Sequence, residues 1–297
     1  KRVEQLRANR LDTLTMPDNE AAWLAFAEEL AMDRHARLVK LSLGNRRRAP
    51  PSSDAVRALM AAVAKHTSLK KLECSNAELG DAGVEHVAAA IAASSSVNWV
   101  NLRANGMTAR GARALADALR DNDRVEMVSI SANDVGDAGI DVIVRAVLAK
   151  QRLERLLLYD QGGVTDASAV PIVALLVGTR KIDTLHIDNF QFSAYVGAAL
   201  RTAIDANVAS PLATLAHNGN KFAALHVRSI EVPRRARLRR TALHTLRDAN
   251  AYARALRARF ALPVLVLDEI ARFCAVHDLP LAVRHRVLRY AHTWTRP

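Results

Sequence analysis

The chain of 297 residues has only two cysteines and no long apolar run. Cys74 and Cys274 lie too far apart to indicate a disulfide framework, so we expect a reducing compartment and a buried Cys74 thiol. Apolar stretches such as residues 170–178 are too short to cross a membrane as a helix. The sequence therefore argues against a disulfide-stapled domain and against a helical membrane protein.

Motifs of catalysis and metal binding are also missing. The sequence has no G-x-x-x-x-G-K-[S/T], no H-E-x-x-H and no G-x-S-x-G. Its ten histidines show no metal-ligand spacing, and we expect His66 and His86 to be partly exposed on helices. His186 is followed by Asp188, but no nucleophile accompanies them. We therefore expect no enzymatic activity, no cofactor and no metal.

The net charge of +12 is unevenly distributed. Residues 223–297 contain 15 Arg and 5 Asp or Glu, a net of +10. Residues 1–222 contain 27 basic and 25 acidic side chains, a net of +2. The basic character therefore belongs to the C-terminal region, and the two parts need separate interpretations.

One pattern, Leu-x-x-Leu-x-Leu, recurs along the first 222 residues. Counting from its first apolar residue, eight repeats begin at Leu11, Leu38, Leu69, Val97, Val125, Leu153, Ile182 and Leu212. The last six start at intervals of 28, 28, 28, 29 and 30 residues. A period of this length predicts a solenoid, which presents an extended surface and encloses no pocket.

The complete pattern is L-x-x-L-x-L-x-x-N-x-L, and residues 80–91 align with residues 136–143 in the second half of the unit. This resembles the leucine-rich repeats of the ribonuclease-inhibitor-like subfamily over about residues 11–222. The resemblance implies a right-handed α/β solenoid, with parallel strands on the concave face and helices on the convex face. We expect this solenoid to occupy residues 1–222, followed by a basic linker and short helices over residues 223–297.

Each repeat also predicts local contacts. Asn105, Asn133 and Asn220 are expected to bond backbone groups of the adjoining turn, and Ala77, Gln161 and Phe190 replace this asparagine elsewhere. The helices should bury the stripes 84/87/91, 112/115/119 and 140/143/147. We expect Asp81, Asp137 and Asp166 to cap their own helices. Gly83, Gly111 and Gly139 should allow close approach of a neighbouring backbone.

Positions three, five and seven of each repeat are expected to point outward from the strands. They include the partly apolar group Trp99, Met127, Leu157 and Tyr159, together with Arg103, Arg155, His186 and the smaller Ser129 and Ser131. Trp, Tyr and Arg are frequent at binding hot spots, so we predict that Trp99, Arg103, Met127, Arg155, Leu157, Tyr159 and His186 bind a partner protein. The alternatives are ordinary isolated surface residues, or a patch covered by a terminal segment.

The C-terminal region contains a dense cationic run with Arg234, Arg235, Arg237, Arg239 and Arg240. This run could bind RNA, an acidic partner or an anionic membrane surface, or serve as a solvated linker. Three short amphipathic helices are expected after it. Residues 262–273 are similar to the opening of an F-box, which implies recruitment of a ubiquitin ligase.

The sequence thus predicts a non-catalytic scaffold that binds a protein on its repeats, is anchored electrostatically by its basic tail, and belongs to a larger complex. One alternative is a structural or assembly component of a ribonucleoprotein, such as an organellar ribosome, with the tail on RNA. A lesser alternative is a ubiquitin-ligase adaptor. We expect an intracellular location, in the cytoplasm or, if a targeting peptide preceded Lys1, in the mitochondrion.

Overall fold

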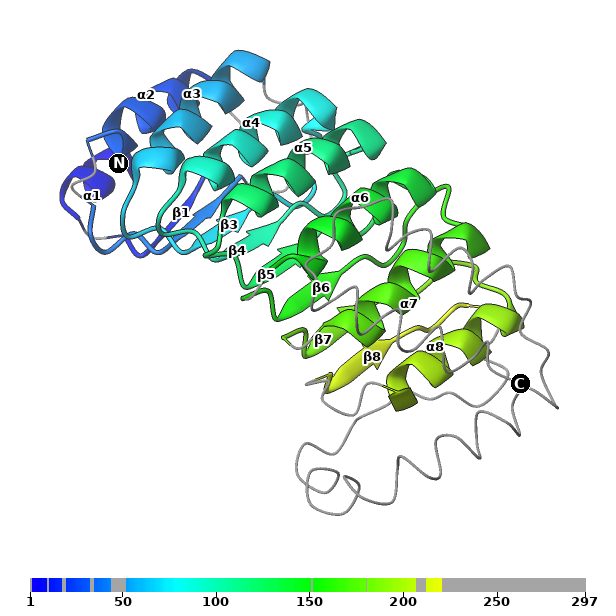
Figure 1. Ribbon diagram of the computed structural model, residues 1–297. Coiled ribbons are helices and arrows are strands. Elements are labelled where there is room, and N and C mark those ends of the chain that lie inside the picture. Colours follow the sequence, from blue (N-terminus) through cyan, green and yellow to red (C-terminus); the bar gives the residue numbers. More distant parts are fainter. Residues whose placement is uncertain are drawn as a thin grey trace, which may run out of the picture. The chain divides into compact units, whose positions relative to one another are not determined.

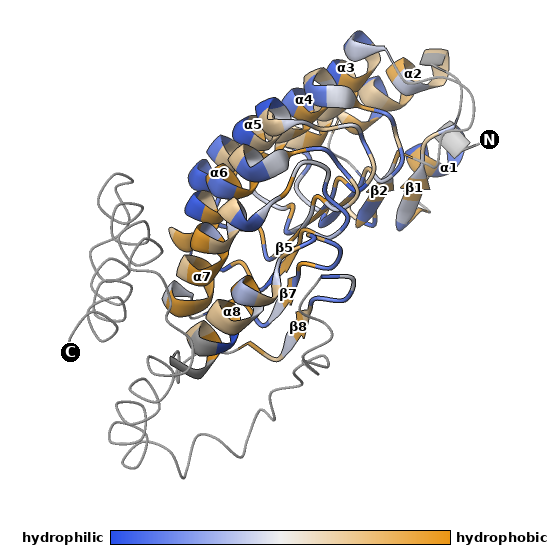
Figure 2. Cartoon of the chain, turned by 90° about the vertical axis from the view of Figure 1, so that its right-hand side faces the viewer, coloured by the Kyte–Doolittle hydropathy of each residue, from blue (hydrophilic) through white to orange (hydrophobic). Residues whose placement is uncertain are grey.

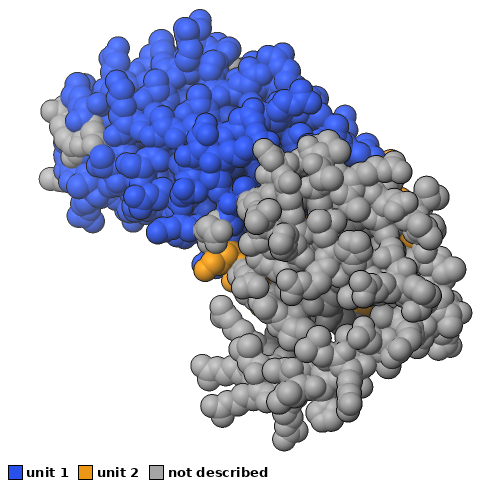
Figure 3. Space-filling model, viewed as in Figure 1, with its two compact units in different colours: residues 1–164 blue, residues 165–297 orange. Residues whose placement is uncertain are grey.

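The computed structural model describes residues 2–9, 11–17, 20–32, 35–43, 52–150, 152–179, 181–206 and 212–220. It divides into two compact units, residues 1–164 and residues 165–297, which are coloured separately in Figure 3. Cys274, the arginines at 234, 235, 237, 239 and 240, and the F-box-like stretch at 262–273 lie outside the described residues. The predictions about residues 223–297 therefore stay predictions.

The first unit alternates short strands with helices. Its strands are β1 (Thr13–Thr15), β2 (Lys40–Ser42), β3 (Lys71–Glu73), β4 (Trp99–Asn101), β5 (Met127–Ser129) and β6 (Arg155–Leu157). Its helices are α1 (Arg2–Arg7), α2 (Glu20–Leu30), α3 (Ser53–Lys65), α4 (Gly80–Ala93), α5 (Ala109–Asp121) and α6 (Gly136–Leu148). Helix α1 was not foreseen in the sequence.

The strands β1 to β6 lie side by side in chain order, and every pair is parallel. Each strand has three residues, and its middle residue is fully buried beneath the helices: Leu14, Leu41, Leu72, Val100, Val128 and Leu156. Figures 1 and 2 show α2 to α6 as one layer and β1 to β6 as a second layer. The predicted α/β leucine-rich-repeat architecture is confirmed.

The second unit contains a 3-10 turn η1 (Asp166–Ser168), α7 (Ala169–Gly178), β7 (Thr184–His186), α8 (Ala194–Ala206) and β8 (Thr214–Ala216). Strands β7 and β8 are parallel. Helix α7 is buried along its whole length, which accounts for the apolar run in the sequence. No helix of the described ranges is long and apolar enough to span a membrane.

The predicted apolar stripes are buried, as Val84, Val87 and Ile91 illustrate on α4. The helix glycines do sit in close contact, but with side chains and not with backbone. A Cβ on Gly111 would lie 2.7 Å from Asp81 Oδ1 and 2.7 Å from Met107 Cγ. The prediction of close approach was therefore right, and its expected partner was wrong.

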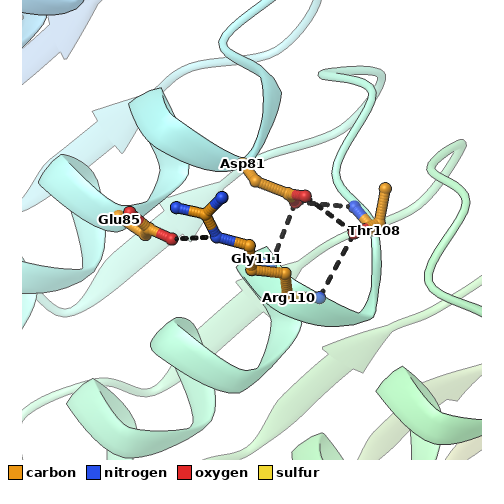
Figure 4. A network of polar contacts seen from close by, with 5 residues as sticks. All are labelled: Asp81, Glu85, Thr108, Arg110 and Gly111. Carbon is orange, nitrogen blue, oxygen red and sulfur yellow. Dashed lines mark hydrogen bonds and ion pairs between the residues drawn. The ribbon is translucent and has the colours of Figure 1, made fainter.

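The helix caps differ most from expectation (Figure 4). Asp81 lies within the first turn of α4, and it caps the next helix: it accepts hydrogen bonds from Thr108 N (2.8 Å), Thr108 Oγ1 (2.7 Å) and Gly111 N (3.0 Å) at the start of α5. Asp166 likewise accepts from Ser193 N, just before α8. The prediction that these residues cap their own helices was wrong, because the repeat geometry brings each carboxylate to the following helix.

Asp137 also lies in the first turn of its own helix α6, and the N-cap residue Val135 makes no side-chain cap bond. Helix α3 begins one residue before Asp54 and is capped by Ser52 Oγ, which accepts from Ala55 N at 3.2 Å. The first turns of these helices thus take their caps from different sources.

Asparagines connect successive repeats through buried hydrogen bonds, which we call the asparagine ladder. Asn133 Oδ1 accepts from Asn105 N and Met107 N, both at 3.0 Å. Asn133 Nδ2 donates to Leu102 O at 3.0 Å and Ile130 O at 2.6 Å. Asn105 likewise accepts from Ala77 N and Leu79 N and donates to Cys74 O. In the second unit, Asn220 accepts from Phe192 N and donates to Ile187 O. The prediction of backbone bonding is confirmed, and the bonded turn belongs chiefly to the preceding repeat.

The ladder weakens where another residue replaces asparagine. Gln161 Nε2 donates to Ile130 O at 2.7 Å, but its buried Oε1 has no hydrogen-bond partner among the described residues. A buried acceptor without a partner is unfavourable. The sequence substitution therefore marks a less regular turn, as expected.

Three buried side chains define the interior near the first repeats. Cys74 is fully buried as predicted, and burial together with the charge of Glu73 raises the pKa of its thiol. His66, expected to be partly exposed, is buried and stacks on His35 with ring centroids 6.2 Å apart. That expectation was wrong because His66 ends α3 and turns inward toward the neighbouring repeat. His86 is partly exposed and lies 2.9 Å from Ser53 Oγ.

Candidate protein-interaction face

The side of β1 to β6 that points away from the helices forms the candidate site, and we call it the strand face. It comprises the side chains at positions three, five and seven of repeats one to six. Alternate residues of a strand point to opposite sides, so the burial of the middle residues beneath the helices leaves these positions outward. Their described members are Thr13, Thr15, Pro17, Lys40, Ser42, Lys71, Glu73, Ser75, Trp99, Asn101, Arg103, Met127, Ser129, Ser131, Arg155, Leu157 and Tyr159.

The strand register aligns these side chains in rows. At position three, Lys71 pairs with Trp99, Trp99 with Met127, and Met127 with Arg155. At position five, Asn101 pairs with Ser129 and Ser129 with Leu157. Parallel strands lie about 4.8 Å apart, so neighbours in a row are in reach of one another. The apolar residues predicted as one patch therefore lie on three adjacent strands and the turns after them.

The exposure of the predicted residues varies. Trp99, Met127, Leu157 and Tyr159 are partly exposed, and Arg155 is exposed. Ser129 and Ser131, expected to point into solvent, are 4% and 0% exposed. The prediction of an open polar surface at these two serines was wrong.

A contact between position-seven side chains explains the burial of Ser131. The Arg103 guanidinium carbon lies 5.8 Å from the centroid of the Tyr159 ring, although a complete repeat separates these residues. Ser131 occupies the same position in the intervening repeat, so Arg103 and Tyr159 lean toward each other above it. A cation over an aromatic face is attracted to it, and this attraction orders both side chains.

Arg103 has one unmet hydrogen-bonding group. Its Nε is inaccessible to solvent and has no acceptor within the described part of the chain. An unpaired buried donor typically costs about 1–3 kcal/mol. The side chain therefore lies against Tyr159 and keeps a buried Nε donor without an acceptor among the described residues.

Two cations on the strand face were not predicted as binding residues. Lys71 is exposed at position three of β3, beside Trp99, and Lys40 is partly exposed at position three of β2. The sequence could have indicated them only through their position in the repeat, because residue type alone does not distinguish them from other surface lysines. They extend the site from the apolar patch toward β2.

His186 lies in the second unit, at position five of β7, and is partly exposed. It is not part of the strand face as defined on residues 1–164. Its role in partner binding stays a prediction.

Within the described ranges, no cluster of three or more His, Cys, Asp or Glu side chains has an arrangement suited to a metal ion.

Comparisons with known proteins give one similarity in sequence and two in fold. No model of a protein family matches the chain. The chain is 30% identical over 130 residues to ribonuclease inhibitor of Sus scrofa, over 43% of this chain and 28% of that protein. The chain thus spans little more than a quarter of the length of this relative.

Two solved structures are similar at low identity. Actin-binding site 2 of leiomodin-1 aligns with 64% of this chain and 90% of its own length, at 14% identity and a TM-score of 0.38. The tropomodulin C-terminal domain of Caenorhabditis elegans aligns with 64% and 93%, at 12% identity and a TM-score of 0.40. The repeat consensus and the parallel strand–helix units make this chain a leucine-rich-repeat solenoid, and part of its sequence is similar to that of ribonuclease inhibitor.

Proposed function

We propose that the chain is a protein-interaction scaffold that binds its partner through the strand face of repeats four to six. The observation that carries this proposal is the group Trp99, Met127, Leu157 and Tyr159, which stays partly exposed on three adjacent repeats. Large apolar side chains gathered on one surface are typical of interfaces. The related ribonuclease inhibitor, as its name states, also acts on another protein.

The order within this group supports the proposal. Fixing a flexible side chain at an interface costs about 0.5–1.5 kcal/mol. Arg103 and Tyr159 are already held against each other, and Trp99 and Met127 are neighbours in the strand register. A partner would therefore meet a surface whose central side chains are largely arranged before binding.

The test is quantitative affinity capture with the full chain and its Trp99→Ala/Tyr159→Ala variant. Truncating a hot-spot residue costs about 2 kcal/mol or more, which is about 30-fold in Kd. We expect at least one partner to be captured by the native chain and lost from the variant. Because both side chains are partly exposed on the solvent side of the strands, thermal unfolding should change little.

Leu24→Ala/Tyr195→Ala is the matched control. Leu24 on α2 and Tyr195 on α8 are 46% and 36% exposed, so their truncation removes similar apolar surface from the helices. This control should retain every partner. Equal capture by the native chain and the Trp99→Ala/Tyr159→Ala variant would exclude the strand face as the binding surface.

A further inference from the structure

We infer that the partner contacts the strand face with an acidic protein segment that carries a large apolar side chain between its carboxylates. This inference rests on the proposed function and adds the chemistry of the partner. It follows from the arrangement of Lys71, Arg103 and Arg155 around the apolar centre formed by Trp99 and Met127.

The position-three row places two apolar side chains between two cations. Lys71 on β3 precedes Trp99 and Met127, and Arg155 on β6 follows them. Both cations are exposed. At about 4.8 Å per strand, they lie on the order of 15 Å apart with two apolar side chains between them. A segment with an apolar anchor and carboxylates on either side matches this spacing.

Arg103 adds a third cation at the same centre, four residues after Trp99 on the same repeat. Tyr159 covers one side of its guanidinium, and the chain supplies no acceptor for its Nε among the described residues. The Arg103 side chain is partly exposed, so a carboxylate of a bound partner can meet its guanidinium at the surface. Guanidinium–carboxylate bonds are among the stronger hydrogen bonds in proteins, and their geometry is selective.

The strand face carries a larger net positive charge than the rest of residues 1–164. Residues 1–164 contain 23 Lys or Arg and 21 Asp or Glu, a net of +2. The described strand face contains four cations (Lys40, Lys71, Arg103 and Arg155) and one anion (Glu73), a net of +3. All other side chains of residues 1–164 therefore sum to −1. Such local charge favours a complementary partner and repels a like one.

This charge also argues against two other occupants. Residues 223–297 of the chain carry a net of +10, so a cationic face would repel them. Nucleic acid is disfavoured because the cations are separated by apolar side chains such as Met127 and Leu157, and because Glu73 lies two residues after Lys71 on the same side of β3. Phosphate backbones are usually bound by a continuous basic stripe.

A random-peptide display selection on the immobilised full chain tests the inference. Selected peptides are then synthesised and measured by fluorescence anisotropy at low and at moderate salt. The charge-reversal variant is Lys71→Glu/Arg155→Glu, and the matched control is Lys65→Glu/Arg113→Glu on α3 and α5. All four side chains are exposed, and both variants change the net charge equally. The comparison therefore separates this face from general attraction, including that of the basic tail.

We expect peptides enriched in Asp or Glu beside a Trp, Phe, Leu or Met, with affinity reduced about tenfold or more by Lys71→Glu/Arg155→Glu and within about twofold in the control. Peptides that need Trp99 but are uncharged or basic would overturn the inference and leave the proposed function intact. Absence of any peptide that depends on Trp99 would overturn both. A single-stranded oligonucleotide bound through Lys71 and Arg155, without acidic peptides, would also overturn the inference.

Discussion

The asparagine ladder and the strand face are built on the same repeats, but their polar groups differ in hydrogen bonding and in exposure to solvent. In the ladder, Asn133 is 7% exposed, and its amide bonds two backbone N–H groups and three backbone carbonyls. On the strand face, Arg103 Nε finds no acceptor in the described structure, and Arg155 points into solvent.

This difference separates two roles within each repeat. Buried amides that are completely bonded stabilise and align the repeats, since leaving such groups unpaired is unfavourable. Side chains on the strand face vary from repeat to repeat, and many of them are partly or fully exposed. Stability should therefore depend on the ladder, and partner choice on the strand face.

Asn133→Ala should have the largest effect on stability. It removes the acceptor of Asn105 N and Met107 N and the donor to Leu102 O and Ile130 O, so buried backbone groups lose their partners. We expect the free energy of unfolding to fall by about 3–4 kcal/mol. Urea unfolding followed by circular dichroism measures the change.

Asn98→Ala is the control for this prediction. Asn98 is partly exposed, and its Nδ2 donates to Glu126 at 3.1 Å. The loss should stay below about 1 kcal/mol. Below its unfolding transition, the Asn133→Ala chain should bind the selected peptides as the native chain does. A similar loss of stability in both variants would contradict the special role of the ladder.

Much of this organisation was predictable from the sequence because it depends on period and residue class. The eight strands follow from Leu-x-x-Leu-x-Leu, since each strand begins two residues after the first apolar residue of its repeat. The buried stripes on α4, α5 and α6 follow from three- and four-residue spacing. The asparagines were recognisable because their position in the unit recurs.

Contacts between successive repeats were not predictable in the same way. Asp81 looked like a cap for α4, and only the placement of α5 beside it shows that Thr108 and Gly111 are its partners. The burial of Ser131 depends on Arg103 and Tyr159 leaning over it from either side. Such contacts depend on side-chain directions in three dimensions, which a linear pattern does not contain.

The next prediction concerns the link between α4 and α5. Asp81→Ala should reduce the free energy of unfolding by about 1–2 kcal/mol, because it removes three hydrogen bonds at the start of α5. Asp81→Asn keeps an acceptor for the backbone groups and loses the negative charge, so about 0.5–1 kcal/mol should be lost at neutral pH. Thermal unfolding of both variants measures these effects.

The effect of Asp81→Asn should depend on pH. Burial raises the pKa of Asp81. Hydrogen bonds from Thr108 and Gly111 and the charge of Arg110 together lower it by more, so the pKa lies below its ordinary value. A carboxyl with a lowered pKa stabilises the fold above its unfolded pKa of about 3.9, and this stabilisation is lost as the pH falls through the folded value. The difference in free energy of unfolding between the native chain and Asp81→Asn should therefore decrease as the pH falls from about 5 to about 3.

Asp117→Asn provides the control for that titration. Its carboxylate pairs with Arg120 on the exposed side of α5, and such surface pairs contribute about 0–1 kcal/mol. Asp117→Asn should change the free energy of unfolding only slightly, because Asp117 takes no part in the contact between α4 and α5. If the difference in free energy of unfolding between the native chain and Asp81→Asn were constant from pH 7 to pH 3, the charge of Asp81 would not contribute to the cap of α5.

The smallest predicted effect concerns the residues between the ladder and the strand face, where each strand ends and its turn begins. Asn76, Ala104, Ala132 and Asp160 all have positive φ there, at the same place in four successive repeats, and Ala132 has a φ of 54°. An alanine in this region is strained, typically by about 1–2 kcal/mol, whereas glycine adopts it freely.

Ala132→Gly should therefore stabilise the chain, by about 0.5 kcal/mol after the greater flexibility of glycine in the unfolded chain is subtracted. Ala89→Gly, on the exposed side of α4, should destabilise it by about 1 kcal/mol. Both changes remove one methyl group, so opposite signs in urea unfolding would isolate backbone conformation as the cause. Peptide affinity should be unchanged in both, because neither side chain belongs to the strand face. A loss of stability in Ala132→Gly would mean that its methyl group contributes more to packing than its backbone conformation costs.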